Sequence, residues 1–375
     1  MLRSIRTGST TVANRRNFPR GIYVVNDRDV AHLDATFTHP YVDGIMRRSH
    51  WKTIEPTVGG DAQTGASPSG TKLGTFWGAV EQDITRARAV SKKIILSVFP
   101  GMLTPNWALT GVTTLWQTVC GGGLSGEEHH QPLPWDTTYQ DRYIAFVQTM
   151  GSLYDGTDMF VPTVGPGSVS AEMGLQDTCN DPLGNPQLQQ WIDAGYLPSK
   201  MYAAWYTFAS AFIDAFPLGY TTAATTQPLP QINEAGEQQA SAATATRDQI
   251  LVNLKAKHGR RMSVQSFGLS AADDDGSPPG GWTGVQTYSP DGPAGFEYQT
   301  SCWNNPSAMG DASSPSNAFK LTCDWGRSAG AGAQYLIVYE PDVTASFTNG
   351  AMMDAFKYTH DKLWASNVRV GGQGA

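Results

Sequence analysis

The stretch KKIILSVF (residues 92–99) has the length and the branched apolar side chains of a buried strand. A long connection follows it, and then an apolar spacing of three and four residues that includes Tyr143 and Val147 predicts an amphipathic helix. The stretch DMFVPTVG (158–165) reads as a second buried strand. A strand, a crossover helix and another strand form the unit from which parallel sheets are built. These residues therefore predict an α/β protein with a parallel sheet.

The same alternation runs through most of the chain and predicts eight strands. They are GIYVV (21–25), VDGIMRRSHW (42–51), KKIILSVF (92–99), DMFVPTVG (158–165), LGYTTAATT (218–226), RMSVQSFGLS (261–270), AGFEYQTS (294–301) and AQYLIVYE (333–340). Amphipathic helix patterns also occur at 76–87, 202–216 and 250–254. Eight strands with crossover helices close into one (β/α)8 TIM barrel. We expect residues 19–375 to form this single barrel domain and residues 1–18 to form a loose N-terminal arm.

The lengths of the connections agree with a barrel. Long connections leave the expected carboxyl ends of strands, at 57–74, 101–135, 174–198 and 271–293. The returns SKK, DGTD, FPLG, HGRR and GAG are short. In this fold the functional residues lie on the long connections at the carboxyl ends of the strands. The sequence therefore predicts long βα loops and a functional site among them.

The composition narrows the classes of partner. Lys and Arg number 26 against 33 Asp and Glu, for a net charge of −7, which provides no basic surface for nucleic acid or an anionic membrane. No stretch is apolar enough for a transmembrane helix, and the first residues lack the apolar core of a signal peptide. Eleven Trp and fourteen Tyr, with 40 Gly and 23 Pro, indicate ordered loops rich in rings. We expect a neutral partner, and this composition suits carbohydrate.

The four cysteines show no CxxC spacing and permit three disulfide pairings. Cys120 with Cys179 and Cys302 with Cys323 are plausible pairs, which favours an oxidising compartment and an extracellular or secreted protein; the alternative is free buried thiols. The seven histidines form neither HxH nor HExxH. We therefore expect no metal and no cofactor.

Three glutamates lie at or near the expected carboxyl ends of strands. Glu172 follows the strand at 158–165, Glu297 lies within AGFEYQTS, and Glu340 ends AQYLIVYE. Two carboxylates that converge at a barrel mouth lined by Trp are what glycoside hydrolysis needs. One protonates the leaving oxygen, and the other attacks the anomeric carbon or activates water.

Four motifs resemble a known family, the large clan of retaining TIM-barrel glycosidases that includes cellulase-type and β-galactosidase families. They are R-x-x-W-K-x-I-E-P (48–56), GPGSVSAEM (165–173), GFEYQ (295–299) and YLIVYE (335–340). The resemblance runs over about residues 20–365, and its motifs at 48–56 and 165–173 are the more specific ones. It implies a retaining glycoside hydrolase that acts on a neutral poly- or oligosaccharide.

The clan carries its acid/base Glu at the end of strand four and its nucleophile Glu on strand seven, which implies Glu172 and Glu297 here. Arg48 matches the strand-two arginine that hydrogen-bonds the nucleophile. Such an arginine would lower the pKa of the Glu297 carboxyl, while a drier site would keep Glu172 protonated.

Two alternatives remain open. If one early strand lies outside the barrel, Glu340 takes the seventh position, so the expected nucleophile is Glu297 or Glu340. Ala171 stands where the clan usually has Asn before the acid/base Glu. This departure keeps open a non-catalytic carbohydrate-binding barrel, an adhesin or a pseudoenzyme.

Further side chains near the strand ends are candidates for substrate binding. Flat rings can stack on the apolar faces of sugars, and polar groups can bind hydroxyls. The predicted substrate-binding residues are Arg48, His50, Trp51, Trp107, Trp135, Gln265, Tyr298 and Trp303; Trp282 and Trp325 also flank expected mouth loops. The sugar, the linkage and the oligomeric state stay open.

Overall fold

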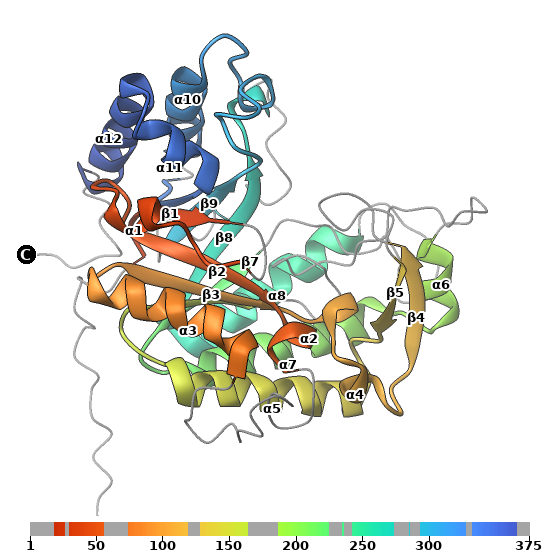
Figure 1. Ribbon diagram of the computed structural model, residues 1–375. Helices are drawn as coiled ribbons and strands as arrows, with labels where there is room; N and C mark the ends of the chain where they lie inside the picture. Colours follow the sequence, from red (N-terminus) through yellow and green to blue (C-terminus); the bar gives the residue numbers. More distant parts are fainter. Residues whose placement is uncertain are drawn as a thin grey trace, which may run out of the picture.

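The eight predicted strands form the core of the protein. In the computed structural model, which describes residues 19–26, 30–55, 74–118, 128–163, 187–224, 235, 242–273, 285, 293–327 and 332–365, each strand lies within one of the predicted stretches. The strands are β1 (Gly21–Val25), β2 (Gly44–His50), β3 (Lys93–Phe99), β6 (Met159–Thr163), β7 (Tyr220–Ala224), β8 (Met262–Leu269), β9 (Ala294–Tyr298) and β10 (Tyr335–Tyr339). They close in the order β1-β10-β9-β8-β7-β6-β3-β2, with every neighbouring pair parallel. The predicted (β/α)8 TIM barrel is confirmed; the expected arm at 1–18 lies outside the described residues (Figure 1).

Helices pack around the outside of this barrel (Figure 1). The longer ones are α3 (Gly74–Ala89), α5 (Thr137–Tyr154), α7 (Pro198–Ala215), α8 (Ala242–His258), α10 (Pro315–Arg327) and α12 (Gly350–Ala365). The predicted helix patterns fall within α3, α5, α7 and α8, except that Phe216 is the residue after α7. Short helices lie in the connections: α1 (Asp34–Thr38), α2 (Trp51–Ile54), α4 (Asn106–Leu109), α6 (Gln187–Asp193), α11 (Glu340–Ser346), and the 3-10 turns η2 (Gly101–Leu103), η4 (Gly259–Arg261), η5 (Ala271–Asp273) and η6 (Ser307–Met309).

The predicted difference between long and short connections is confirmed. The helix α3 ends at Ala89 and β3 begins at Lys93, whereas the chain runs from Phe99 at the end of β3 to Thr137 before α5 begins. This long connection leaves the carboxyl end of β3, and the short return enters the amino end of the same strand, as the fold requires.

Side chains alternate between the two faces of each strand and so form two separate cores. Tyr23 and Tyr335 fill the inside of the barrel with edge-to-face rings 5.8 Å apart. Gly44 and Gly295 face these two rings, and a Cβ at either position would overlap the ring. The other face packs against the helices, as Val24 and Val338 do. Both faces are buried, which is why the strands read as continuous apolar stretches.

The connection after β3 contains an antiparallel hairpin that the sequence did not predict. It pairs β4 (Thr114–Thr118) with β5 (Glu128–Pro132). Figure 1 shows it beside α6, apart from the barrel, on the side where β3 ends. The segment EHHQP lacks the alternation of apolar and polar residues that identifies strands, so the hairpin depends on tertiary contacts with η2 and α6.

The predicted disulfide between Cys302 and Cys323 is wrong, because both residues are free buried thiols. Each packs into the outer core near Tyr298, and burial raises the pKa of the Cys323 thiol to about 12. Sequence spacing alone does not bring two sulfur atoms to bonding geometry. The other expected pair, Cys120 and Cys179, lies outside the described residues. The described part of the chain contains no helix that could cross a membrane.

Candidate active site at the carboxyl end of the barrel

An arginine and a glutamate meet inside the barrel near the ends of the strands. Arg48 on β2 donates from Nη2 to Oε2 of Glu297 on β9. These strands are not neighbours, since β10 and β1 lie between them. The side chain of Arg48 is 13% exposed and that of Glu297 is 4% exposed. The contact expected for Arg48 is therefore present, while the predicted roles, Glu297 as a catalytic residue and Arg48 as a substrate-binding residue, stay predictions.

A tyrosine binds the other oxygen of the same carboxylate. The hydroxyl of Tyr339, at the end of β10, donates to Oε1 of Glu297 over 3.1 Å. Burial raises the pKa of Tyr339 well above its usual value, and the negative charge of Glu297 raises it further. The hydroxyl thus stays protonated and remains a donor. The two oxygens of one carboxylate thus accept from two different side chains, a cation and a hydroxyl, which fixes the orientation of Glu297.

Aromatic rings surround the guanidinium of Arg48. It lies 6.0 Å from the ring centroid of Phe99 and 5.9 Å from that of Phe267. These rings shield the ion pair from water and attract the cation. His50 follows Arg48 by two residues on β2, so it shares the inner face at the very end of the strand.

Gln265 lies one layer deeper than predicted for a substrate contact. It pairs in register with Gly295, two residues before Glu297, and its side chain is completely buried. Its Oε1 accepts from the hydroxyl of Tyr335 over 3.2 Å. Gln265 therefore supports the floor of the site.

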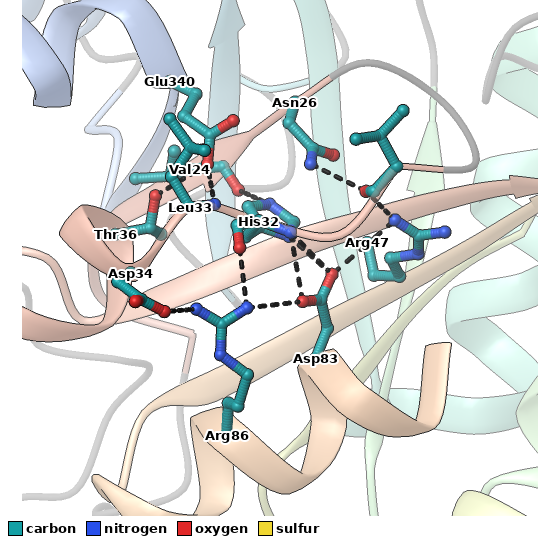
Figure 2. A network of polar contacts seen from close by, with 11 residues as sticks. Val24, Asn26, His32, Leu33, Asp34, Thr36, Arg47, Asp83, Arg86 and Glu340 are labelled. Carbon is teal, nitrogen blue, oxygen red and sulfur yellow. Dashed lines mark hydrogen bonds and ion pairs between the residues drawn. The ribbon is translucent and has the colours of Figure 1, made fainter. Parts of the chain in front are cut away.

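Glu340 does not join the pair inside the barrel. Its Oε1 accepts from the backbone N–H of Leu33 over 2.6 Å and from the hydroxyl of Thr36 over 3.0 Å, so its carboxylate holds α1 (Figure 2). Its neighbour Val338, two residues earlier, lies in the outer core. Of the two candidate nucleophiles, only Glu297 lies beside Arg48.

The predicted acid/base, Glu172, lies outside the described residues, as do Ala171 and Trp282. The strand β6 that precedes it ends at Thr163 and runs parallel to β9, so the chain enters that segment from the carboxyl end of the barrel. The role of Glu172 remains a prediction.

Two predicted substrate-binding rings are core residues instead. Trp51 is completely buried against α5, 5.1 Å from the ring of Tyr143, and its Nε1 donates to Oε2 of Glu55 over 2.8 Å. Tyr298 is also completely buried, and its hydroxyl donates to the backbone oxygen of Phe319 on α10 over 2.9 Å. Tyr298 directly follows Glu297, so strand alternation turns it to the outer face.

The other predicted rings differ in exposure. Trp107 and Trp135 are half-buried; Trp107 donates from Nε1 to the backbone oxygen of Glu55, and Trp135 packs between Trp191 and Tyr196. Trp325 is half-buried in the last turn of α10. Trp303, in the connection after β9, is 39% exposed. Among the predicted Trp residues that the structure describes, Trp303 is the most exposed.

Sequence reasoning missed two residues at this end of the barrel. Tyr339 binds Glu297, and the two-residue alternation of YLIVY (335–339) would have placed it on the inner face with Tyr335. Trp116 on β4 is an exposed ring whose centroid lies 4.4 Å from that of His130. It could not be found because the hairpin that carries it was not predicted.

A second group of charged residues lies on the outer face of β1 and β2 (Figure 2). Asp83 of α3 accepts from the backbone N–H and from Nδ1 of His32, the latter over 2.8 Å, and forms an ion pair with Arg47 at 3.6 Å. Nε2 of His32 faces the backbone oxygen of Val24 at 3.0 Å. These side chains are buried, so the group joins the connection after β1 to α3. Among the residues described, no three His, Cys, Asp or Glu side chains are grouped to hold a metal ion.

No protein-family model matches this chain, and no curated protein does. Several solved structures are similar to it in fold. A broad-specificity endoglucanase from an uncultured bacterium is 10% identical, with a TM-score of 0.46 over 87% of this chain and 82% of the other. A beta-mannanase from the blue mussel Mytilus edulis is 12% identical, with a TM-score of 0.45 over 93% and 94%. A thermostable mutant of a xylanase from Cellvibrio japonicus is 12% identical, with a TM-score of 0.46 over 86% of each chain.

Proposed function

We propose that the protein is a glycoside hydrolase that cleaves a neutral poly- or oligosaccharide by retaining double displacement, with Glu297 as nucleophile and Glu172 as acid/base. The observation that carries this proposal is the Glu297 carboxylate inside the barrel, bound by Arg48 on one oxygen and by Tyr339 on the other. A nucleophilic carboxylate must be held towards the reacting carbon, and these two donors hold the Glu297 side chain from both of its oxygens.

The pair also has the right place for this chemistry. Glu297 is the fourth residue of the five in β9, and Arg48 lies two residues before the end of β2. In (β/α)8 enzymes the reacting groups lie at the carboxyl ends of the strands. The motifs around Arg48 and Glu297 resemble the retaining clan, and that resemblance supplies Glu172 as the second carboxyl group.

The reaction has two steps. In the first, an oxygen of Glu297 forms a bond to the anomeric carbon while the bond to the leaving oxygen breaks, and the Glu172 carboxyl gives its proton to that oxygen. In the second, the Glu172 carboxylate takes a proton from water, whose oxygen displaces Glu297 at the anomeric carbon. Arg48 and Tyr339 hold the Glu297 side chain in one orientation and receive it back as an anion.

Two variants test the assignment of the nucleophile. We expect Glu297→Gln to lower kcat on a hydrolysed hexasaccharide by at least about 10⁴-fold, because the amide cannot form the glycosyl ester. The substrates are cellohexaose, mannohexaose and xylohexaose, and product release is followed by chromatography. Glu340→Gln is the matched control, because its carboxylate binds Leu33 and Thr36, and it should retain activity.

The product identifies the mechanism. With Glu297→Ala, added azide can occupy the space of the lost carboxylate and attack the anomeric carbon in one displacement, so an activated aryl glycoside should give a glycosyl azide of the opposite anomeric configuration. Full activity of Glu297→Gln would exclude this nucleophile, and loss of activity in Glu340→Gln alone would assign the role to Glu340. Sugar binding without turnover in the natural protein would favour the carbohydrate-binding barrel.

A further inference from the structure

A buried aspartate lies just beyond the end of β10. Asp342 is in the first turn of α11, three residues after Tyr339, and is completely buried. Its Oδ1 accepts from the hydroxyl of Ser301 over 2.9 Å and from the backbone N–H of Trp303 over 2.8 Å. A carboxylate just after β10 therefore holds the connection that follows β9 by two charge-assisted hydrogen bonds.

The segment that it holds is tightly ordered by its own contacts. The hydroxyl of Ser301 accepts from the backbone N–H of Asn304 over 3.2 Å. The backbone oxygen of Ser301 accepts from the backbone N–H of Asn305 over 2.9 Å. The side chain of Cys302 is buried in the outer core. Trp303 thus lies on a backbone that several hydrogen bonds hold in place, and the residue is 39% exposed.

The segment that carries Trp303 begins beside the Glu297 carboxylate. The hydroxyl of Tyr339 lies 3.1 Å from Oε1 of Glu297 and 3.4 Å from the backbone oxygen of Gln299. The junction of β10 and α11 therefore contacts the Glu297 carboxylate through Tyr339 and the Trp303 backbone through Asp342. Both contacts lie at the carboxyl end of the barrel.

Burying a carboxylate costs stability even when it is hydrogen-bonded, so packing alone does not account for Asp342. Trp303, whose backbone this carboxylate holds, is 39% exposed and lies in the connection that leaves the carboxyl end of β9, the strand that carries Glu297. An exposed ring on a backbone held in this way is suited to a ligand with an apolar face, because little freedom is lost when the ligand binds. We propose that Trp303 is a stacking platform for a pyranose ring of the substrate and that Asp342 is the positioning residue that holds it. This inference rests on the proposed glycosidase function and adds a binding subsite to it.

The protonation of Asp342 gives a second test, because a role in packing alone would not make KM depend on pH. Burial raises the pKa of Asp342 to about 6, against the opposing effect of its hydrogen bonds. The titratable groups that face it are the Cys302 thiol and the Tyr298 hydroxyl, whose pKa values burial also raises, so both stay neutral at this pH. As the pH falls through about 6, Asp342 becomes neutral and its bonds to Ser301 and Trp303 weaken.

The test measures kcat and KM with whichever of cellohexaose, mannohexaose and xylohexaose the natural protein hydrolyses. We expect Trp303→Ala to raise KM about 5- to 10-fold with kcat within about twofold. Asp342→Ala should raise KM by a similar or smaller factor, and the double variant should not exceed Trp303→Ala alone, because Asp342 acts through Trp303. The control is Trp364→Ala, which removes a ring 48% exposed whose Nε1 binds Asp43 at the opposite end of the barrel; its KM should not change.

Asp342→Asn keeps an acceptor oxygen and removes the charge, so it serves if Asp342→Ala does not fold. The KM of the natural protein should rise as the pH falls from 7 to 5, and the KM of Asp342→Asn should vary less. An unchanged KM in Trp303→Ala, or single effects that multiply in the double variant, would overturn the subsite and leave the proposed hydrolase standing. Failure of the natural protein to bind or cleave all three hexasaccharides would overturn both.

Discussion

Arg47 and Arg48 are neighbours on β2, and each meets a carboxylate, but on opposite faces of the strand. Arg48 points into the barrel and donates to Glu297. Arg47 points outward to Asp83 at 3.6 Å and donates to the backbone oxygen of Val30 (Figure 2). The two residues are of the same type and adjacent on one strand, and the alternation of side chains sends them to opposite faces. The surroundings separate them.

The outer pair belongs to a closed network. The Asp83 side chain has no exposed surface and also forms an ion pair with Arg86 at 3.6 Å. His32 binds it through both the backbone N–H and Nδ1. The inner pair instead lies near the mouth, where Arg48 keeps some exposed surface. A buried Arg–carboxylate pair is therefore not a sign of function by itself, and the inner pair is a candidate because it lies at the carboxyl ends of the strands.

The largest effect should come from breaking the outer network. We expect Asp83→Asn to lower the free energy of unfolding by about 3–5 kcal/mol. The substitution removes the negative charge of the carboxylate that His32, Arg47 and Arg86 contact. Denaturant unfolding measures it. Turnover per folded molecule should stay unchanged, in contrast to Glu297→Gln.

The matched control for that variant uses the same helix. Arg88 of α3 binds Asp158 over 2.8 Å, with both side chains partly exposed. Asp158→Asn should change the free energy of unfolding by less than about 1 kcal/mol. Equal losses in the two variants would mean that the outer network is no stronger than a surface ion pair.

A second prediction concerns Asp342, the buried carboxylate at the carboxyl end of the barrel. The pKa of Asp342 in the folded protein is about 6, above its ordinary value of 3.8. The folded state therefore binds the proton more tightly than the unfolded state, and its stability should fall as the pH rises from about 4 to about 6, by up to roughly 3 kcal/mol. Asp342→Asn lacks this dependence. The unfolding free energy of the variant minus that of the natural protein should therefore increase as the pH rises from about 4 to about 6. A constant difference from pH 4 to pH 7 would contradict the buried charge.

The smallest effect concerns the hydroxyl of Tyr339 that donates to Glu297. Tyr339→Phe removes the donor to Oε1 and leaves Arg48 in place, so kcat should fall about 10-fold with KM nearly unchanged. Tyr335→Phe is the control, because its hydroxyl binds Gln265 one layer deeper, and its kcat should stay within about twofold. Equal losses would mean that both hydroxyls act through packing.

Much of the architecture could be predicted from sequence because its causes are local. Strands of parallel sheets are buried on both faces and read as apolar stretches, and the alternation of connections closes them into a barrel. The resemblance of the motifs around Arg48 and Glu297 suggested the contact between these two residues, whose strands are not neighbours.

Other features depended on contacts that no local pattern contains. Trp51 and Trp303 both follow a strand end, yet α5 covers Trp51 while Asp342 holds the backbone of Trp303 with its ring exposed. Cys302 and Cys323 both enter the outer core without bonding to each other.

By itself, the sequence determined which stretches become the strands of the barrel, their parallel arrangement and the end of the barrel that carries the candidate site, because these follow from apolar periodicity and the lengths of connections. Only the tertiary structure decided which ring is exposed, which glutamate faces Arg48 and which arginine belongs to the closed network. Exposure and charge pairing depend on side chains far apart in the chain, as Glu340 and Thr36 illustrate. Their distances are set only when the barrel closes.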